Sequence, residues 1–86
     1  MADYQLQIFT QEEKVFDKQV TAVTVPGEDG YFGVWAHHAP IVATIGRGKL
    51  TIRIHNEETE YQLEGGFFEM HNNVATLLVD SFSEST

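Results

Sequence analysis

Apolar and polar residues alternate with a period of two along most of this chain. Between residues 4 and 8, three apolar side chains alternate with two glutamines, and the same pattern returns between residues 50 and 55. An apolar side chain at every second position predicts a half-buried strand. Because no stretch carries a helical apolar stripe of useful length, the pattern predicts an all-β protein.

Turn-forming residues divide this pattern into short segments. Turns are expected at residues 10–14, 26–30, 46–48, 56–59 and 71–73, and strands at 4–8, 15–25, 31–35, 41–45, 50–54, 61–67 and 74–79. Val74–Val79 is apolar on both faces, which is typical of a central strand. Many short strands at this spacing favour a β-sandwich or barrel, of about eight to ten strands.

Length and charge limit the classes of function. The 86 residues support one domain, expected at residues 1–80, with a polar flexible tail at residues 81–86. Thirteen acidic residues against five basic ones give a net charge of −8, which disfavours nucleic acid and anionic lipid as partners. No stretch approaches the roughly 20 apolar residues of a spanning helix, so membrane association is expected only through another protein.

No set of residues predicts catalysis, a cofactor or a metal. The chain has no cysteine, which excludes disulfides and thiolate chemistry. His37 and His38 are adjacent and point to opposite faces of an extended chain, so they do not share one ion. The segment 46–49 lacks the spacing of a phosphate loop and precedes a strand. Glu69 and Asp80 are not brought together by any pattern.

Several residues have two interpretations. The ring of His38 either bonds the backbone next to Pro40 or contacts a partner. Gly65 and Gly66, inside a strand pattern, indicate a bulge or a close backbone approach. In the short strand 31–35, alternation sends Phe32 to the core and leaves Tyr31 as a candidate interface anchor.

Four stretches together resemble one known family. They are Gly30-x-Phe32-Gly33-Val34 with His38-Ala39-Pro40, Gly48-x-Leu50-x-Ile52, Gly65-Gly66-Phe67-x-Glu69, and Asn73-x-Ala75-Thr76-x-Leu78-x-Asp80. Their order and spacing are similar to the N-terminal domain of the epsilon subunit of F-type ATP synthase, which is the delta subunit of the mitochondrial enzyme. The resemblance implies a flattened sandwich of antiparallel strands.

The resemblance also implies a function. It predicts a non-catalytic rotor subunit that joins the gamma subunit to the membrane c-ring of a proton-translocating ATP synthase, at the cytoplasmic face of the membrane. The residues that it places toward gamma are Thr10, His38, Val42 and Ala43. Those that it places toward the c-ring are Glu28, Asp29 and Tyr31.

Two points qualify the carry-over from the family. Most members continue into a helical hairpin that brakes the motor and, in some members, binds ATP; the chain stops before it, so those roles are not carried over. A naturally short member and a piece of a longer one give the same sequence. The rival interpretation is a stand-alone β-sandwich binding module or a cupin-like metal protein, which requires a concave pocket with converging polar groups.

Overall fold

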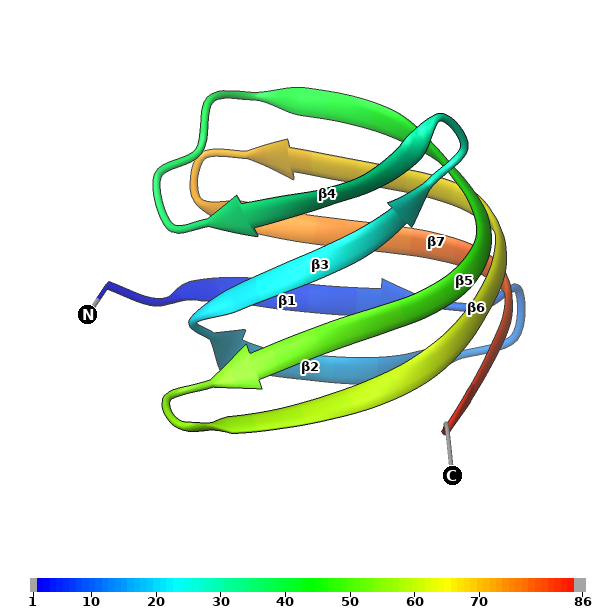
Figure 1. Cartoon of the computed structure of the whole chain (residues 1–86), viewed down its shortest axis with the longest axis horizontal. Helices are drawn as coiled ribbons and strands as arrows, with labels where there is room; N and C mark the ends of the chain where they lie inside the picture. The colour runs from blue at the N-terminus through cyan, green and yellow to red at the C-terminus, as the bar shows by residue number, and fades with distance from the viewer. Residues whose placement is uncertain (1, 85–86) are drawn as a thin grey trace.

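The chain forms seven strands in a computed structural model, which describes residues 2–84. The strands curl into the two layers of a sandwich (Figure 1). Their bounds are β1 Tyr4–Phe9, β2 Lys14–Val20, β3 Ala22–Gly27, β4 Gly30–Trp35, β5 Ile41–Ile54, β6 Glu57–His71 and β7 Val74–Glu84. The predicted all-β class is confirmed.

One continuous sheet supplies both layers. Its order is β2-β1-β7-β6-β5-β3-β4, so β2 and β4 are the two edge strands and β7 is central, as its apolar sequence predicts. Neighbouring strands are antiparallel except β1 and β7, which run parallel. The strands in the described residues are fewer and longer than expected. β5 joins the two segments predicted at residues 41–45 and 50–54, and β6 extends the segment predicted at residues 61–67 at both ends.

The long strands bend from one layer into the other. Figure 1 shows β5 and β6 curving together around one side of the molecule. At this bend, the residues that face the core change from odd-numbered to even-numbered positions in β5 and β6. The same change occurs in the neighbouring strand β7. The core-facing residues on either side of this bend (residues 46–48, 65–66 and 80–81) are Ile45 and Leu50 in β5, Leu63 and Phe68 in β6, and Val79 and Phe82 in β7.

Glycine makes the bend possible in β6. Gly65 and Gly66 have φ values of 69° and 123°, which side-chain-bearing residues rarely adopt. A Cβ on Gly66 would lie 1.9 Å from the carbonyl oxygen of Leu78. Of the two expected interpretations, a bulge or a close backbone approach, the structure shows the close approach. A constant period of two along residues 61–67 would place Phe67 on the same face as Leu63. That expectation is wrong, because Gly65 and Gly66 reverse the face: Leu63 is buried and Phe67 is exposed.

The expected long strand at residues 15–25 is two strands in different layers. The chain breaks at Thr21, which is 2% exposed. Its N–H donates to the carbonyl oxygen of Arg53 over 2.8 Å, and its hydroxyl oxygen accepts from the N–H of His55 over 2.8 Å. The polar groups of this buried corner are therefore satisfied by Arg53 of β5 and by His55 directly after it, and not by a continuing strand.

Three other boundaries are settled by backbone geometry. Asn72 and Asn73 have φ values of 52° and 62°, which confirms the turn predicted there. The preceding hairpin, between β5 and β6, turns at residues 55–56, not 56–59, and β6 begins at Glu57. Residues 81–84, expected in a polar tail, instead pair with β6 as the end of β7, where Phe82 lies opposite Leu63; residues 85–86 lie outside the described part.

Aliphatic and aromatic side chains from both layers fill the core. Tyr4 and Phe68 are the largest fully buried ones, and Phe68 meets Phe32 edge-on with ring centroids 5.5 Å apart. The hydroxyl of Tyr4 donates to the carbonyl oxygen of Val34 over 2.8 Å, which joins β1 to β4 across the core. Burial raises the pKa of Tyr4 well above its ordinary value. Across residues 2–84, no helix has the length and apolarity to cross a membrane.

Candidate partner-binding surfaces

A row of apolar side chains lies on the outside of one layer. Phe67 of β6 is 56% exposed, and its cross-strand neighbours are Thr44 of β5 and Leu78 of β7, which is 53% exposed. Leu78 in turn lies opposite Phe9 of β1. These four residues, together with Val42 beside them at 71% exposure, are called the apolar row below. Contiguous exposed apolar groups of this kind mark interaction surfaces.

The apolar row borders a shallow hollow of about 420 Å³ over the bend. Thr10, from the turn between β1 and β2, lines this hollow beside Phe67 and Leu78. Asp80 forms another part of its wall, and its carboxylate lies over Gly65, where an added Cβ would come within 2.5 Å of Oδ2. Glu69 lies opposite Val42, so carboxylates flank the apolar row at both sides.

The structure brings together only part of the set predicted for gamma. Val42 belongs to the apolar row and Thr10 lies beside it, whereas Ala43 alternates inward and pairs with the buried Phe68. His38 is exposed in the turn between β4 and β5, and its Nδ1 lies 2.7 Å from the carbonyl oxygen of Ala39. The predicted ring-to-backbone bond next to Pro40 is therefore confirmed.

Phe67 and Leu78 were not predicted as site residues. The sequence did contain a signal for Leu78. The segment 74–79 is apolar on both faces, and in a two-layer sandwich only one face of a strand is covered by the other layer, so its second apolar face is exposed. Phe67 was hidden by the reversal at Gly65 and Gly66, which period-two reading does not detect.

The residues predicted for the c-ring gather at one exposed tip. Glu28 and Asp29 form the turn between β3 and β4, and Tyr31 follows directly with 60% exposure. Tyr31 packs over Gly48, and its hydroxyl oxygen accepts from the N–H of Lys49 over 3.0 Å. The tip (residues 28–31) is thus fastened to β5.

Among the described residues, most basic side chains are in ion pairs, whereas several acidic side chains are not. Ion pairs engage four of the five basic residues, and Lys18 lies 5.8 Å from the ring centroid of Phe16. The ion pairs are Lys14–Asp17 at 2.6 Å, Arg47–Glu64 at 2.6 Å, Lys49–Glu60 at 3.7 Å and Arg53–Glu58 at 3.2 Å. The hydrogen bond from Lys14 holds the pKa of Asp17 below its ordinary value. Within residues 2–84, Glu28, Asp29, Glu69 and Asp80 have no ion pair.

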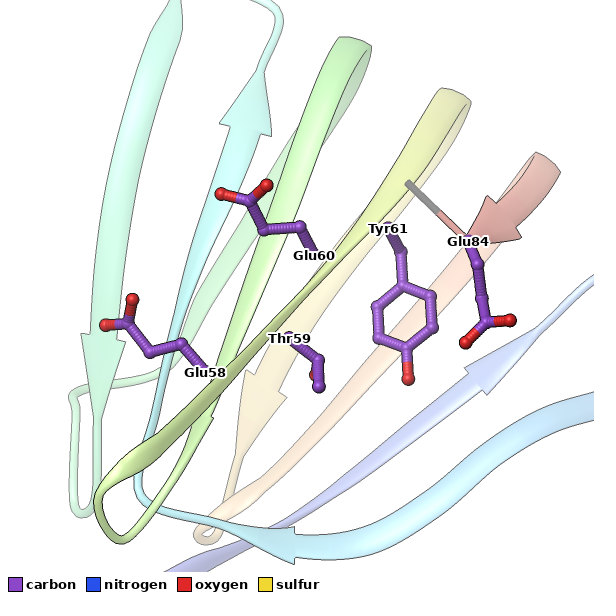
Figure 2. Close-up of a pocket in the computed structure, with 5 residues that line it drawn as sticks. All are labelled: Glu58, Thr59, Glu60, Tyr61 and Glu84. Carbon is purple, nitrogen blue, oxygen red and sulfur yellow. The ribbon is translucent and has the colours of Figure 1, made fainter. Parts of the chain in front are cut away.

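A second hollow lies near the end of β7, and the acidic side chains that line it do not converge on one point. In Figure 2, the carboxylates of Glu58 and Glu60 extend to one side of β6, whereas Tyr61 and Glu84 lie on the other side. Tyr61 stacks on Phe82 with ring centroids 4.7 Å apart. Among residues 2–84, no three His, Cys, Asp or Glu side chains converge as a metal site would require.

The fold and these surfaces define a small β-sandwich domain. Residues 3–85 match the family described as the beta-sandwich domain of the ATP synthase delta/epsilon chain. The chain belongs to this family.

Curated relatives agree with the family match. The chain is 43% identical over 79 residues to an ATP synthase epsilon chain of Protochlamydia amoebophila. The aligned part covers 91% of this chain and 54% of that protein. It is 38% identical over 81 residues to an ATP synthase epsilon chain of Chlorobium limicola. Here the aligned part covers 93% of this chain and 92% of that protein. It thus spans about half of the first relative and nearly all of the second.

Two solved structures have the same fold. The first is a chain in the mitochondrial ATP synthase of Euglena gracilis, an OSCP/F1/c-ring structure, with a TM-score of 0.91, 23% identity, and coverage of 98% of this chain and 54% of that one. The second is a chain in the central stalk/c-ring of the Tetrahymena thermophila mitochondrial enzyme, with a TM-score of 0.80, 14% identity, and coverage of 93% and 65%. At these identities the likeness shows the fold alone.

Proposed function

We propose that this chain is a non-catalytic rotor subunit in the central stalk of a proton-translocating F-type ATP synthase. It binds the gamma subunit through the apolar row, with Thr10 beside it, and through His38 in the turn between β4 and β5. It contacts the membrane c-ring through the tip at Glu28, Asp29 and Tyr31. It lies at the cytoplasmic face of the membrane and is held there by these protein partners.

The observation that carries this proposal is the exposed apolar row in a chain of the epsilon family. Phe67, Leu78 and Val42 have more than half of their surface exposed to water. Each lies in a strand that is paired with its neighbours and whose other face packs on the core. A partner that covers them gains the free energy of removing that surface from water, about 25 cal/mol per Å². Stable interfaces bury about 1,200–2,000 Å² in total, so the apolar row is the centre of a larger contact.

The two surfaces are mechanically joined. The N–H of Glu28 at the tip donates to the carbonyl oxygen of Thr44 over 2.8 Å, and Thr44 is a member of the apolar row. A close-packed sandwich deforms little under load. A force that the c-ring applies at the tip is therefore transmitted to gamma at the apolar row with little elastic deformation of the domain. This stiffness is the physical contribution of the subunit to torque transfer.

Titration with purified gamma tests the apolar row. The double variant Phe67→Ser and Leu78→Ser is expected to bind gamma at least about tenfold more weakly, because two apolar contacts are lost. Arg53→Gln, in the other layer, serves as the exposed control and is expected to bind normally. Unchanged affinity of the double variant, with its unfolding midpoint near that of the wild type, would remove the apolar row from the interface.

A separate titration with the purified c-ring tests the tip. Glu28→Lys with Asp29→Lys reverses the charge of the turn, so we expect weaker binding and a smaller decrease of affinity with salt. The matched control is Glu57→Lys with Glu84→Lys, which changes the net charge by the same amount elsewhere. If affinity and salt dependence stay as in the wild type, the tip does not face the ring.

A further inference from the structure

The two edge strands of the sheet differ in how they are protected. The edge strand β2 carries Lys14, Asp17 and Lys18, its pairing with β1 shifts register near Phe9, and Phe16 contacts Tyr61 of β6. Charges and irregular pairing of this kind discourage a further strand from adding to an edge. The other edge strand, β4, has the sequence GYFGVW and carries no charge.

The register of β4 indicates which backbone groups face its open side. Tyr31 lies opposite Pro26 of β3, and proline has no N–H to donate. Residues 31 and 33 therefore occupy positions that do not exchange hydrogen bonds with β3, because bonded and non-bonded pairs alternate in an antiparallel ladder. The N–H and C=O groups of Tyr31 and Gly33 thus point away from β3, toward the open edge.

Aromatic side chains flank these backbone groups. Tyr31 and Trp35 are 60% and 58% exposed on the outer face of β4. The indole of Trp35 lies along the strand over Gly33, where an added Cβ would come within 2.8 Å of two ring atoms. Phe32 and Val34 point into the core and hold the strand in place. The edge is therefore rigid, uncharged and bordered by two large aromatic surfaces.

Charge selects the kind of segment that fits this edge. Glu28 and Asp29 lie at the turn that begins β4, and the described residues offer them no ion pair. A basic side chain placed there gains an opposite charge, and an arginine also stacks on an exposed aromatic ring.

We propose that an extended, basic segment of a rotor neighbour pairs with β4 as an additional strand. Its backbone hydrogen-bonds to Tyr31 and Gly33, its side chains cover Trp35, and a lysine or arginine lies beside Glu28 and Asp29. This strand addition supplies main-chain affinity with specificity from the flanking side chains. The inference rests on the proposed function for the identity of the neighbour, which is the c-ring, because the proposed function assigns the tip at the start of β4 to it. The surface shares Glu28, Asp29 and Tyr31 with that tip and is distinct from the apolar row.

Amide hydrogen exchange in the assembled rotor tests the pairing directly. In the isolated chain, the Gly33 amide is expected to exchange quickly, because no strand covers it. In the complex with purified gamma and c-ring, it is expected to exchange at least about tenfold more slowly. Unchanged exchange of Gly33 within a formed complex overturns the strand pairing and leaves the stalk function standing, whereas a chain that binds neither partner overturns both.

A matched pair of variants isolates the hydrogen bond. Gly33→Ala and Gly33→Pro both displace the indole of Trp35, but only proline also removes the N–H that faces the open edge. Gly33→Pro is expected to bind the rotor about three- to tenfold more weakly than Gly33→Ala, as one lost hydrogen bond requires. Equal affinities of two folded variants overturn the pairing.

Discussion

Phe67 and Phe68 are consecutive residues of β6 whose side chains lie on opposite faces of the sheet. Phe68 is fully buried against Phe32, whereas Phe67 is 56% exposed on the outer face. The same side chain thus contributes to the core at one position and to a partner surface at the next. The glycine pair directly before them determines which of the two is inside.

Truncating each phenylalanine separates stability from binding. Phe68→Ala is expected to lower the free energy of unfolding by about 3–5 kcal/mol, because it leaves a cavity in the core. Phe67→Ala is expected to cost less than about 1 kcal/mol, because its ring is already largely in water. Urea unfolding measures both values, and Phe68→Leu with Phe67→Leu provides a milder pair if the first core variant does not fold. Equal losses within a pair would contradict the assignment of faces.

Gly66 permits the bend by the absence of a side chain. Gly66→Ala is expected to destabilise the fold by about 3 kcal/mol or more, because the new Cβ would collide with the Leu78 carbonyl oxygen in a backbone that cannot yield freely. Gly30→Ala is the control: its φ is also positive, at 137°, but nothing lies within 4 Å of the added atom. The control is expected to cost about 1–2 kcal/mol of backbone strain.

The comparison is made from urea midpoints at equal slope. A larger loss at Gly66 than at Gly30 assigns the difference to the collision. If the two variants lose the same stability, the close approach of β6 to β7 does not constrain the fold.

Local alternation was enough to predict the class of fold and most strand positions. The positions of Tyr4, Leu6 and Ile8 in β1 follow from period two alone, because one face of that strand is buried along its whole length. The turn at Asn72 and Asn73 was equally readable, since asparagine tolerates positive φ better than most residues. The inward placement of Phe32 followed from the same alternation.

The bend could not be predicted, because it depends on contacts between distant segments. The glycines at 46 and 48 carry ordinary turn chemistry, and only pairing with β6 shows that β5 continues through them. The break at Thr21 likewise depends on a distant segment, because Arg53 at the end of β5 bonds its N–H and His55 bonds its hydroxyl. A constant period of two places Phe67 on the same face as Leu63, so it does not reveal the centre of the apolar row.

The fastening of the tip depends on one phenol oxygen. Tyr31→Phe keeps the ring over Gly48 but removes the acceptor for the N–H of Lys49, so the Lys49 amide is expected to exchange about two- to tenfold faster. Tyr61→Phe is the control, since no hydrogen bond joins its hydroxyl to another described residue. Exchange measured by NMR distinguishes the two, and an unchanged Lys49 rate in Tyr31→Phe would show that the tip is held by packing alone.

Tyr4 gives the fold a dependence on alkaline pH. Its pKa is raised by burial in the folded chain, whereas in the unfolded chain it is near the ordinary value of about 10. Above that pH the unfolded chain releases the phenol proton while the folded chain retains it. The stability contributed by neutral Tyr4 is therefore fully present below about pH 10 and is lost as the pH rises, by up to about 1.4 kcal/mol per unit.

Tyr4→Phe removes this proton and the bond to Val34. At pH 8 the variant is expected to be less stable than the wild type by about 1 kcal/mol, the net value of one hydrogen bond. Between pH 8 and pH 11 the advantage of the wild type is expected to shrink, because only the wild type has a buried phenol to ionise on unfolding. Urea unfolding of both proteins across this range measures the difference. A constant difference from pH 8 to pH 11 would mean that Tyr4 loses its proton equally easily in both states.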